Sequence, residues 1–157
     1  MTATKVIGES VKQTNRTFIK SYVEDYAKAN TEKYRRYHLN TLNGNLHGNY
    51  PEYAREQLDA IENGTANLIK FKVYTGKRYY KIVQQEFETW EGSRNYGKYA
   101  DGSVHCFVDK ETGDVYKPAS WSAPAKHIRF TFQNVDHLKF LLNPDNVGWA
   151  GGYLYIR

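Results

Sequence analysis

In the first third of the chain, hydrophobic residues recur at the three- and four-residue spacing of an amphipathic helix. This spacing predicts a helix over residues 10–42, in one piece or in two. Asn30-Thr31 offers a cap that would divide the segment, and Asn43-Gly44 is expected to end it, because glycine favours the left-handed conformation after a helix. The residues on the apolar face are Phe18, Ile19, Tyr22, Val23, Tyr26 and Ala27, with Tyr34, Tyr37 and Leu42 continuing the stripe.

A second helix is predicted after residue 50. Pro51 suits a first helical turn, because its missing N–H would have no partner there, and Asn63-Gly64 provides the stop. We expect Tyr53, Leu58 and Ile61 to face inward.

After residue 65 the pattern changes to the two-residue alternation of strands. Residues 68–73 alternate apolar and basic side chains, with Ile69, Phe71 and Val73 inward, and a turn at Thr75-Gly76 leads into a returning strand over 78–83. The other expected elements are a loop over 92–102, strands over 104–108, 114–117, 128–132 and 152–156, and a short helix over 135–142. The turn at 110–113 requires a positive φ at Gly113.

The order of these elements predicts an α+β fold, in which N-terminal helices pack on an antiparallel β-sheet. A length of 157 residues is that of one domain. We therefore expect a single domain over 1–157, helical over 1–64 and built around the sheet over 66–157.

Composition adds a basic, tyrosine-rich character. The chain has 22 Lys and Arg against 17 Asp and Glu, a net charge of +5, and 14 Tyr. Residues 1–50 hold 8 basic and 4 acidic residues, so most of the surplus lies there. An aromatic content of 15% excludes a disordered chain. The charge is compatible with an anionic partner without requiring one.

Cysteine usage and hydropathy bear on location. Cys106 is the sole cysteine, so no intramolecular disulfide can form, which suits a reducing compartment. The N-terminal sequence lacks the pattern of a signal peptide, and the apolar runs are far shorter than the ~20 residues that span a bilayer. We expect an intracellular protein without membrane contact.

The strongest candidate for function is the hairpin over 68–81. It carries basic residues and tyrosines and no acidic residue, a combination that neutralises phosphates and stacks on bases. The alternative is a strand pair whose lysines discourage edge-to-edge aggregation, with Glu86, Glu88 and Glu91 offsetting part of the charge. The candidate nucleic-acid-binding residues are Lys70, Lys72, Tyr74, Lys77, Arg78, Tyr79 and Lys81.

A second candidate is the proline-stiffened connection over 116–126. We expect Trp121 to be buried or stacked between its prolines. This segment could form an anion site or support a Ser–Lys nucleophile, and otherwise it is a packed structural loop. The candidate residues for the anion or loop site are His105, Lys117, Ser120, Trp121, Lys126 and Arg129.

The sequence contains no motif for a metal or a cofactor, and we expect neither. The five histidines lack HxxxH spacing, Cys106 has no CxxC partner, and neither a P-loop nor a Rossmann glycine pattern occurs. The segment 109–114 reads as a hairpin turn rather than a calcium loop. His105 and Cys106 are expected to point to opposite faces of their strand.

Residues 102–126 resemble a segment of a group of small, uncharacterised bacteriophage proteins, with the pattern VHxFVDKxTGDVYKPASWxAPAK. Weaker similarity extends to 80–83 and 153–157. Ser122 stands where a basic residue is expected, which weakens the idea of a fixed phosphate grip in this loop. The resemblance implies a phage protein in the cytoplasm of an infected host cell or associated with the virion. It implies no catalytic or binding residues, because no activity is established for the group.

Three functions remain open. The first is a phage accessory protein that acts by contact, most directly with nucleic acid through the 68–81 hairpin and the basic N-terminal helix. The second is a protein-interaction or virion component that binds a phage or host protein, or a second copy of itself, through the tyrosine-lined helix. The third is a small hydrolase using His105, Lys117 and Ser120 with Lys126, although no pattern identifies a reaction.

Overall fold

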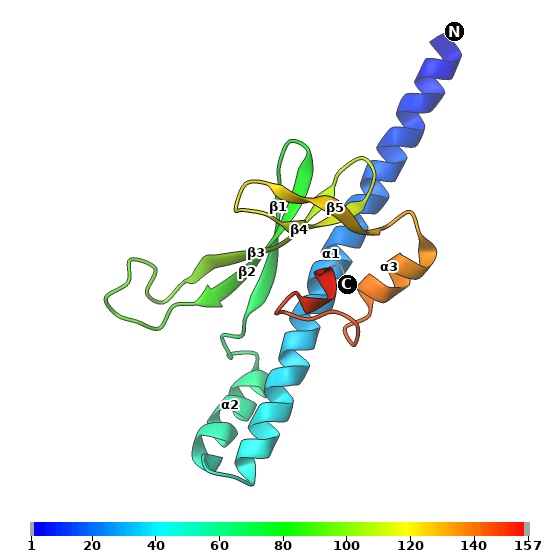
Figure 1. The fold of residues 1–157 in the computed structure, drawn as a ribbon. Helices are drawn as coiled ribbons and strands as arrows, with labels where there is room; N and C mark the ends of the chain where they lie inside the picture. The colour runs from blue at the N-terminus through cyan, green and yellow to red at the C-terminus, as the bar shows by residue number, and fades with distance from the viewer. Residues whose placement is uncertain (1, 156–157) are drawn as a thin grey trace.

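The computed structural model describes residues 2–155, with side chains over 16–155, and has the predicted α+β fold (Figure 1). The long helix α1 runs behind the sheet, its N-terminal turns extend beyond it, and α2 lies beside its C-terminal half. The elements are α1 (Thr2–Leu46), α2 (Pro51–Asn63), β1 (Lys70–Thr75), β2 (Tyr79–Phe87), β3 (Tyr99–Asp109), β4 (Asp114–Pro118), β5 (Pro124–Thr131), α3 (Val135–Leu142) and the 3₁₀ helix η1 (Gly152–Leu154).

Helix α1 is continuous, which confirms the one-piece alternative, and Asn30-Thr31 does not cap a second helix. Both side chains bond to the carbonyl group one turn earlier: Asn30 Nδ2 donates to the Tyr26 carbonyl at 3.1 Å, and Thr31 Oγ1 donates to the Ala27 carbonyl at 3.0 Å. Asn43-Gly44 does not end the helix either, since α1 continues to Leu46. No proline occurs before residue 51, so the backbone hydrogen-bond ladder can continue through both sites.

The predicted ends of helix α2 are confirmed. Pro51 occupies the first turn, and Gly64 caps the C-terminus with φ 75°. The inward position of Tyr53 is wrong, because its side chain is 53% exposed, while the neighbouring Ala54 is buried.

The five strands form an antiparallel meander in the order β1-β2-β3-β4-β5. One face packs against α1, where Ile19, Val23 and Tyr26 lie in a buried cluster with strand residues. Those strand residues are Phe71, Tyr80, Ile82, Cys106, Val108 and Val115. The alternation predicted for 68–73 is confirmed for Phe71, and Ile69 and Val73 pack against the cluster while partly exposed.

A β-bulge at His105 contradicts the expected orientation of this residue. Ile82 pairs with Cys106 but Val83 pairs with Val104, so His105 is an extra residue in β3. His105 Nε2 lies 2.7 Å from the Tyr153 hydroxyl, and Cys106 hydrogen-bonds to Tyr26. Both side chains therefore enter the same buried cluster, which regular alternation would forbid.

The C-terminal segment forms no strand. The predicted strand over 152–156 is wrong for its described part, which forms η1, and residue 156 lies outside the described residues. Gly151, at φ 74°, turns the chain, after which Leu154 is buried and the Tyr153 hydroxyl bonds to that of Tyr26 on α1. The expected loop over 92–102 is also shorter, because β3 begins at Tyr99.

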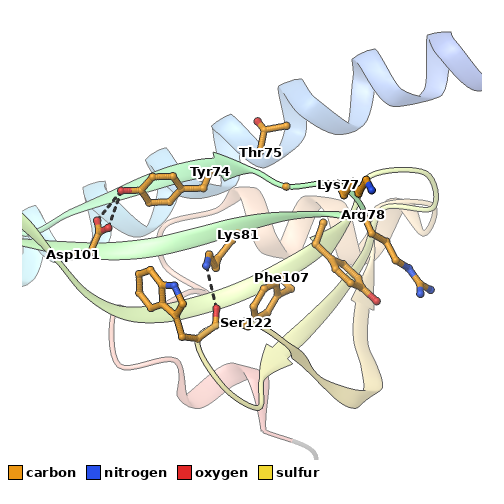
Figure 2. Close-up of a pocket in the computed structure, with 11 residues that line it drawn as sticks. Tyr74, Thr75, Lys77, Arg78, Lys81, Asp101, Phe107 and Ser122 are labelled. Carbon is orange, nitrogen blue, oxygen red and sulfur yellow. Dashed lines mark hydrogen bonds between the residues drawn. The ribbon is translucent and has the colours of Figure 1, made fainter.

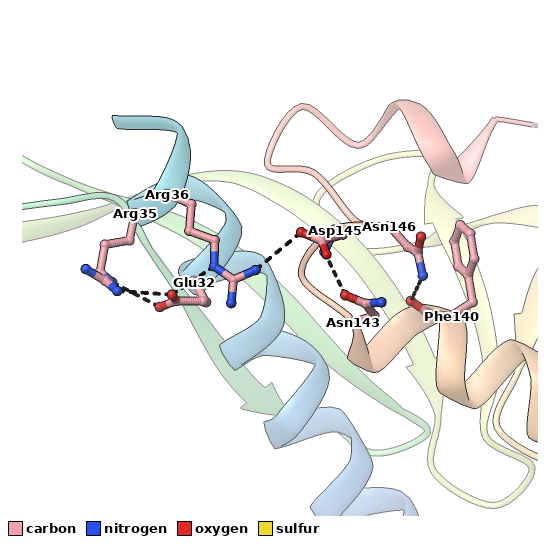
Figure 3. A network of polar contacts seen from close by, with 7 residues as sticks. All are labelled: Glu32, Arg35, Arg36, Phe140, Asn143, Asp145 and Asn146. Carbon is pink, nitrogen blue, oxygen red and sulfur yellow. Dashed lines mark hydrogen bonds and ion pairs between the residues drawn. The ribbon is translucent and has the colours of Figure 1, made fainter. Parts of the chain in front are cut away.

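An exposed polar network joins α1 to the turn after α3 (Figure 3). Glu32 pairs with Arg35 and Arg36, and Arg36 Nη1 reaches Asp145 Oδ1 at 3.3 Å. The hydrogen bond from Arg35 is the main cause of the lowered pKa of Glu32. Such solvent-exposed pairs contribute ~0–1 kcal/mol each, so the network orients the turn more than it stabilises the fold.

The β3–β4 turn confirms the need for glycine at position 113 and provides a test. Gly113 has φ 76°, and an added Cβ would lie 3.0 Å from the Cβ of Phe132. Gly64 has nearly the same φ but nothing within 4 Å of the added atom. We expect Gly64→Ala to cost about 1–2 kcal/mol of folding free energy from φ alone. Gly113→Ala should cost a further ~1–3 kcal/mol from crowding.

Chemical denaturation of the two variants measures this difference. Equal losses at the two positions would show that Phe132 does not crowd the turn.

Candidate nucleic-acid interface

A groove of about 360 Å³ lies on the face of the sheet away from α1 (Figure 2). Its position follows from alternation. Ile82 and Cys106 face α1, so their neighbours Lys81 and Phe107 face the groove, and Tyr74 pairs with Lys81 across β1 and β2. The β1–β2 turn closes one end.

Most of the predicted hairpin residues line this groove. Those residues are Tyr74, Lys77, Arg78, Tyr79 and Lys81. Lys70 and Lys72 lie further along β1, where their ammonium groups stand 3.7 Å and 4.7 Å from the ring centroids of Tyr99 and Tyr74. Five of the seven predicted residues thus lie together in one groove, and Lys70 and Lys72 lie outside it.

Trp121 lines this groove and also a shallow hollow beside Ser120 in its own loop. It comes from the β4–β5 connection, and Lys81 Nζ lies 4.1 Å from its ring centroid and donates to its carbonyl at 3.0 Å. Trp121 is not buried as expected, since it is 46% exposed. Its free surface is available for stacking.

The rest of the second candidate set is dispersed. His105 is buried against Tyr153, while Lys117 Nζ lies 4.4 Å from the ring centroid of Tyr155. Ser120 Oγ accepts hydrogen bonds from the amides of residues 122 and 123, Arg129 Nε donates to the Leu154 carbonyl at 2.7 Å, and Lys126 is exposed.

A hydrolase would need its acid–base groups within hydrogen-bond reach. Among the described residues, no recorded contact joins His105, Lys117 and Ser120. The structure therefore adds no support for the hydrolase alternative, which stays a hypothesis.

The groove is positively charged. Lys77, Arg78 and Lys81 line it against one carboxylate, a net charge of +2. That carboxylate, Asp101, accepts hydrogen bonds from the Tyr74 hydroxyl and from Gln85 Nε2, each at 2.8 Å. The Gln85 bond is the main cause of its lowered pKa.

Lys77 has no ion-pair or hydrogen-bond partner for its ammonium group within residues 16–155. It is therefore free to bind an anion.

Aromatic side chains form the floor of the groove. The Tyr79 ring meets Phe107 and Tyr116 edge-on at centroid distances of 5.9 Å and 6.0 Å, and the Arg78 guanidinium lies 5.2 Å from the Tyr79 centroid. Sequence reasoning missed Phe107 and Asp101. Alternation along β3 could have placed Phe107 on the face of the sheet opposite to that of Cys106. Its pairing with Lys81 depends on the register between β2 and β3, which alternation does not give.

The polar side chains of His105, Cys106, Tyr26 and Tyr153 form a buried cluster between the sheet and α1. Their pKa values show whether these groups could act in catalysis. Burial lowers the pKa of His105 to about 4 and raises that of the Cys106 thiol to about 12. Burial also raises the pKa values of Tyr26 and Tyr153. A thiol with such a pKa is a poor nucleophile at neutral pH, so the cluster has the character of a structural core.

The described part of the chain contains neither a candidate metal site nor a candidate membrane-spanning helix. Within residues 16–155, no three His, Cys, Asp or Glu side chains are grouped to hold a metal ion. No helix described here combines the length and apolar character needed to cross a bilayer.

Residues 6–156 match a family of unknown function, DUF7717. The chain belongs to this family. The region shared with DUF7717 runs from within α1 to beyond η1, so it contains both the groove and the buried cluster. It also contains the segment 102–126 that resembles phage proteins, and phage origin stays a prediction. No curated protein and no solved structure matches this DUF7717 chain.

Proposed function

We propose that this DUF7717 protein binds single-stranded nucleic acid in the groove, as a phage accessory protein that acts by contact rather than by catalysis. One observation carries the proposal. Lys81 and Trp121, 40 residues apart in sequence, meet on an open sheet face that also presents Lys77, Arg78 and Tyr79. Cations beside exposed rings are the means by which sheet surfaces bind unpaired bases.

The arrangement of rings favours single strands over a duplex. Trp121 is half exposed and Tyr74 and Tyr79 are partly exposed, so bases could stack on them only after leaving a helical stack. The lysines and arginine contact phosphates without reading sequence. We therefore expect a preference for unpaired strands with little dependence on base sequence.

A protein-interaction role is the second candidate, because Phe18 on α1 is 53% exposed. It stacks on Tyr22 at a centroid distance of 6.3 Å, beside a hollow of about 330 Å³ that Phe132 also lines. Failure to bind nucleic acid would leave this helix surface as the better hypothesis.

Binding to labelled single-stranded DNA, single-stranded RNA and duplex DNA at low salt tests the proposal. Loss of a stacking ring costs about 1–3 kcal/mol, so Trp121→Ala should weaken single-strand binding ~5- to 150-fold. Lys77→Gln should reduce the slope of log K against log salt by about 0.7, the value for one phosphate contact to a single strand. Fluorescence anisotropy over a salt series measures both effects.

Two variants serve as matched controls. Trp90→Ala removes an equally large ring, 68% exposed in the β2–β3 loop, and Lys139→Gln removes an exposed charge on α3. Both should bind as the unmodified protein does. Absence of binding at low salt, or equal losses for Trp90→Ala and Trp121→Ala, would overturn the proposal.

A further inference from the structure

A second hollow adjoins the groove around the β1–β2 turn. Its volume is about 460 Å³, and it shares Lys77 and Arg78 with the groove. Arg16 from α1 and Lys110 from the β3–β4 turn also line it. The two hollows thus form neighbouring parts of one basic surface, contributed by the sheet and by the long helix.

The carboxylates of this hollow are already engaged. Asp109 is buried, and its Oδ1 accepts the backbone amides of residues 111 and 112 at 2.8 Å and 3.1 Å. Its Oδ2 lies 3.7 Å from Arg78 Nε, while Glu111 pairs with Arg16. Four cations against two carboxylates leave a net charge of +2.

The cations keep unused donors. The Arg78 side chain is 73% exposed and that of Arg16 is 50% exposed, and each guanidinium has five N–H donors of which the ion pairs use few. Lys110 Nζ donates to the Gly76 carbonyl at 3.1 Å, which leaves two of its three N–H groups. The hollow can therefore accept a further anion.

The two hollows differ in what they can bind. The groove offers rings and cations, whereas the second hollow, as described within residues 16–155, is lined by charged residues and Thr112 without an aromatic side chain. A base has no ring to stack on there, but a phosphate group has several donors. This division suits a strand whose bases lie in the groove while its backbone continues past the turn.

We propose that the strand bound in the groove continues around the β1–β2 turn, so that its next phosphates bind Arg16 and Lys110 in the second hollow. This inference rests on the proposed function. It makes the ligand an oligonucleotide chain rather than a nucleotide, and it gives α1 a direct part in binding.

The test compares single-stranded oligonucleotides of about four and about ten nucleotides, lengths within the usual range of site sizes. The double variant Arg16→Gln/Lys110→Gln should lose affinity for the longer strand and reduce its salt slope by about 1.4, the value for two phosphate contacts. It should bind the shorter strand as the unmodified protein does. The advantage of the longer strand should therefore shrink.

The control is Lys20→Gln/Lys28→Gln, which removes the same charge from exposed positions of α1 outside both hollows. Its affinity and salt slope should stay close to those of the unmodified protein. The inference is overturned if the two double variants behave alike, or if Arg16→Gln/Lys110→Gln keeps the full length dependence. If Trp121→Ala still weakens binding in that case, the groove survives as the site. Absence of all binding at low salt removes both proposals.

Discussion

Tyr26→Ala is expected to lower the free energy of unfolding by about 3–5 kcal/mol, the range for truncating a large buried ring. Tyr26 is fully buried where α1 meets the sheet. Its ring meets Phe132 and Tyr153 edge-on at centroid distances of 6.2 Å and 6.5 Å. Truncation removes these contacts and leaves a cavity that a long helix and a sheet cannot close by small shifts.

Two further variants separate the contributions to this loss. Tyr26→Phe keeps the ring but removes the hydroxyl, which lies 2.6 Å from that of Tyr153, and should cost about 1–3 kcal/mol. Tyr53→Ala removes an exposed ring from α2 and should change stability by no more than about 0.5 kcal/mol. Denaturant unfolding of all three measures the order. A Tyr26→Ala loss no larger than that of Tyr53→Ala would contradict the packing of α1 described above.

Acid should destabilise the fold through His105 by about 3 kcal/mol between pH 6.5 and pH 4. Burial lowers the pKa of His105 from its usual 6.5 to about 4 in the folded protein. The unfolded chain therefore binds a proton at this position near pH 6.5, while the folded chain stays neutral until about pH 4. Stability is complete above the unfolded pKa and falls as the pH drops, by about 1.4 kcal/mol for each unit of the pKa difference.

The surroundings of His105 support a loss of stability, rather than a gain, when the imidazole is protonated. Its ring meets Phe71 edge-on at 5.1 Å, and the groups around it are uncharged in acid, because the pKa values of Tyr153, Tyr26 and Cys106 are raised. The nearest polar partner is the Tyr153 hydroxyl at 2.7 Å, which offers an imidazolium no compensating charge.

Denaturant unfolding of the unmodified protein and of His105→Gln across this pH range measures the effect. His105→Gln should remove most of the pH dependence, leaving smaller contributions from His38, whose pKa is also lowered by burial, and, near pH 4, from the lowered pKa values of Glu32 and Asp101. A free energy of unfolding that stays constant from pH 6.5 to pH 4 would show that His105 is not buried as described.

Local signals predict several elements closely. Helix α3 spans 135–142 as predicted, because Asn134 caps it through bonds from the amides of residues 136 and 137. Alternation places Phe71 in the core, and turn chemistry requires glycine at 113. In each case the feature that decides the structure lies within a few residues of the position concerned, so a short stretch of sequence is enough to predict it.

The errors occur where distant contacts outweigh local preference. Asn30 is a favourable cap residue, but α1 continues through it, and its buried side chain instead approaches Tyr153 from the C-terminal segment, with Nδ2 3.5 Å from the hydroxyl. The apolar alternation of 152–156 is typical of a strand. In the structure, burial of Leu154 and the hydrogen bond between the hydroxyls of Tyr153 and Tyr26 hold the described part in η1.

The sequence by itself determined the α+β class, the hairpin that carries the basic and aromatic residues, and the glycine turns, because periodicity and turn preferences are local properties. Only the tertiary structure decided that Lys81 lies over the Trp121 ring, that the bulge turns His105 into the core, and that Arg16 and Lys110 line one hollow. Each of these depends on strand register or on the packing of a helix across the sheet. Such contacts join residues far apart in the chain, and no short stretch of sequence specifies them.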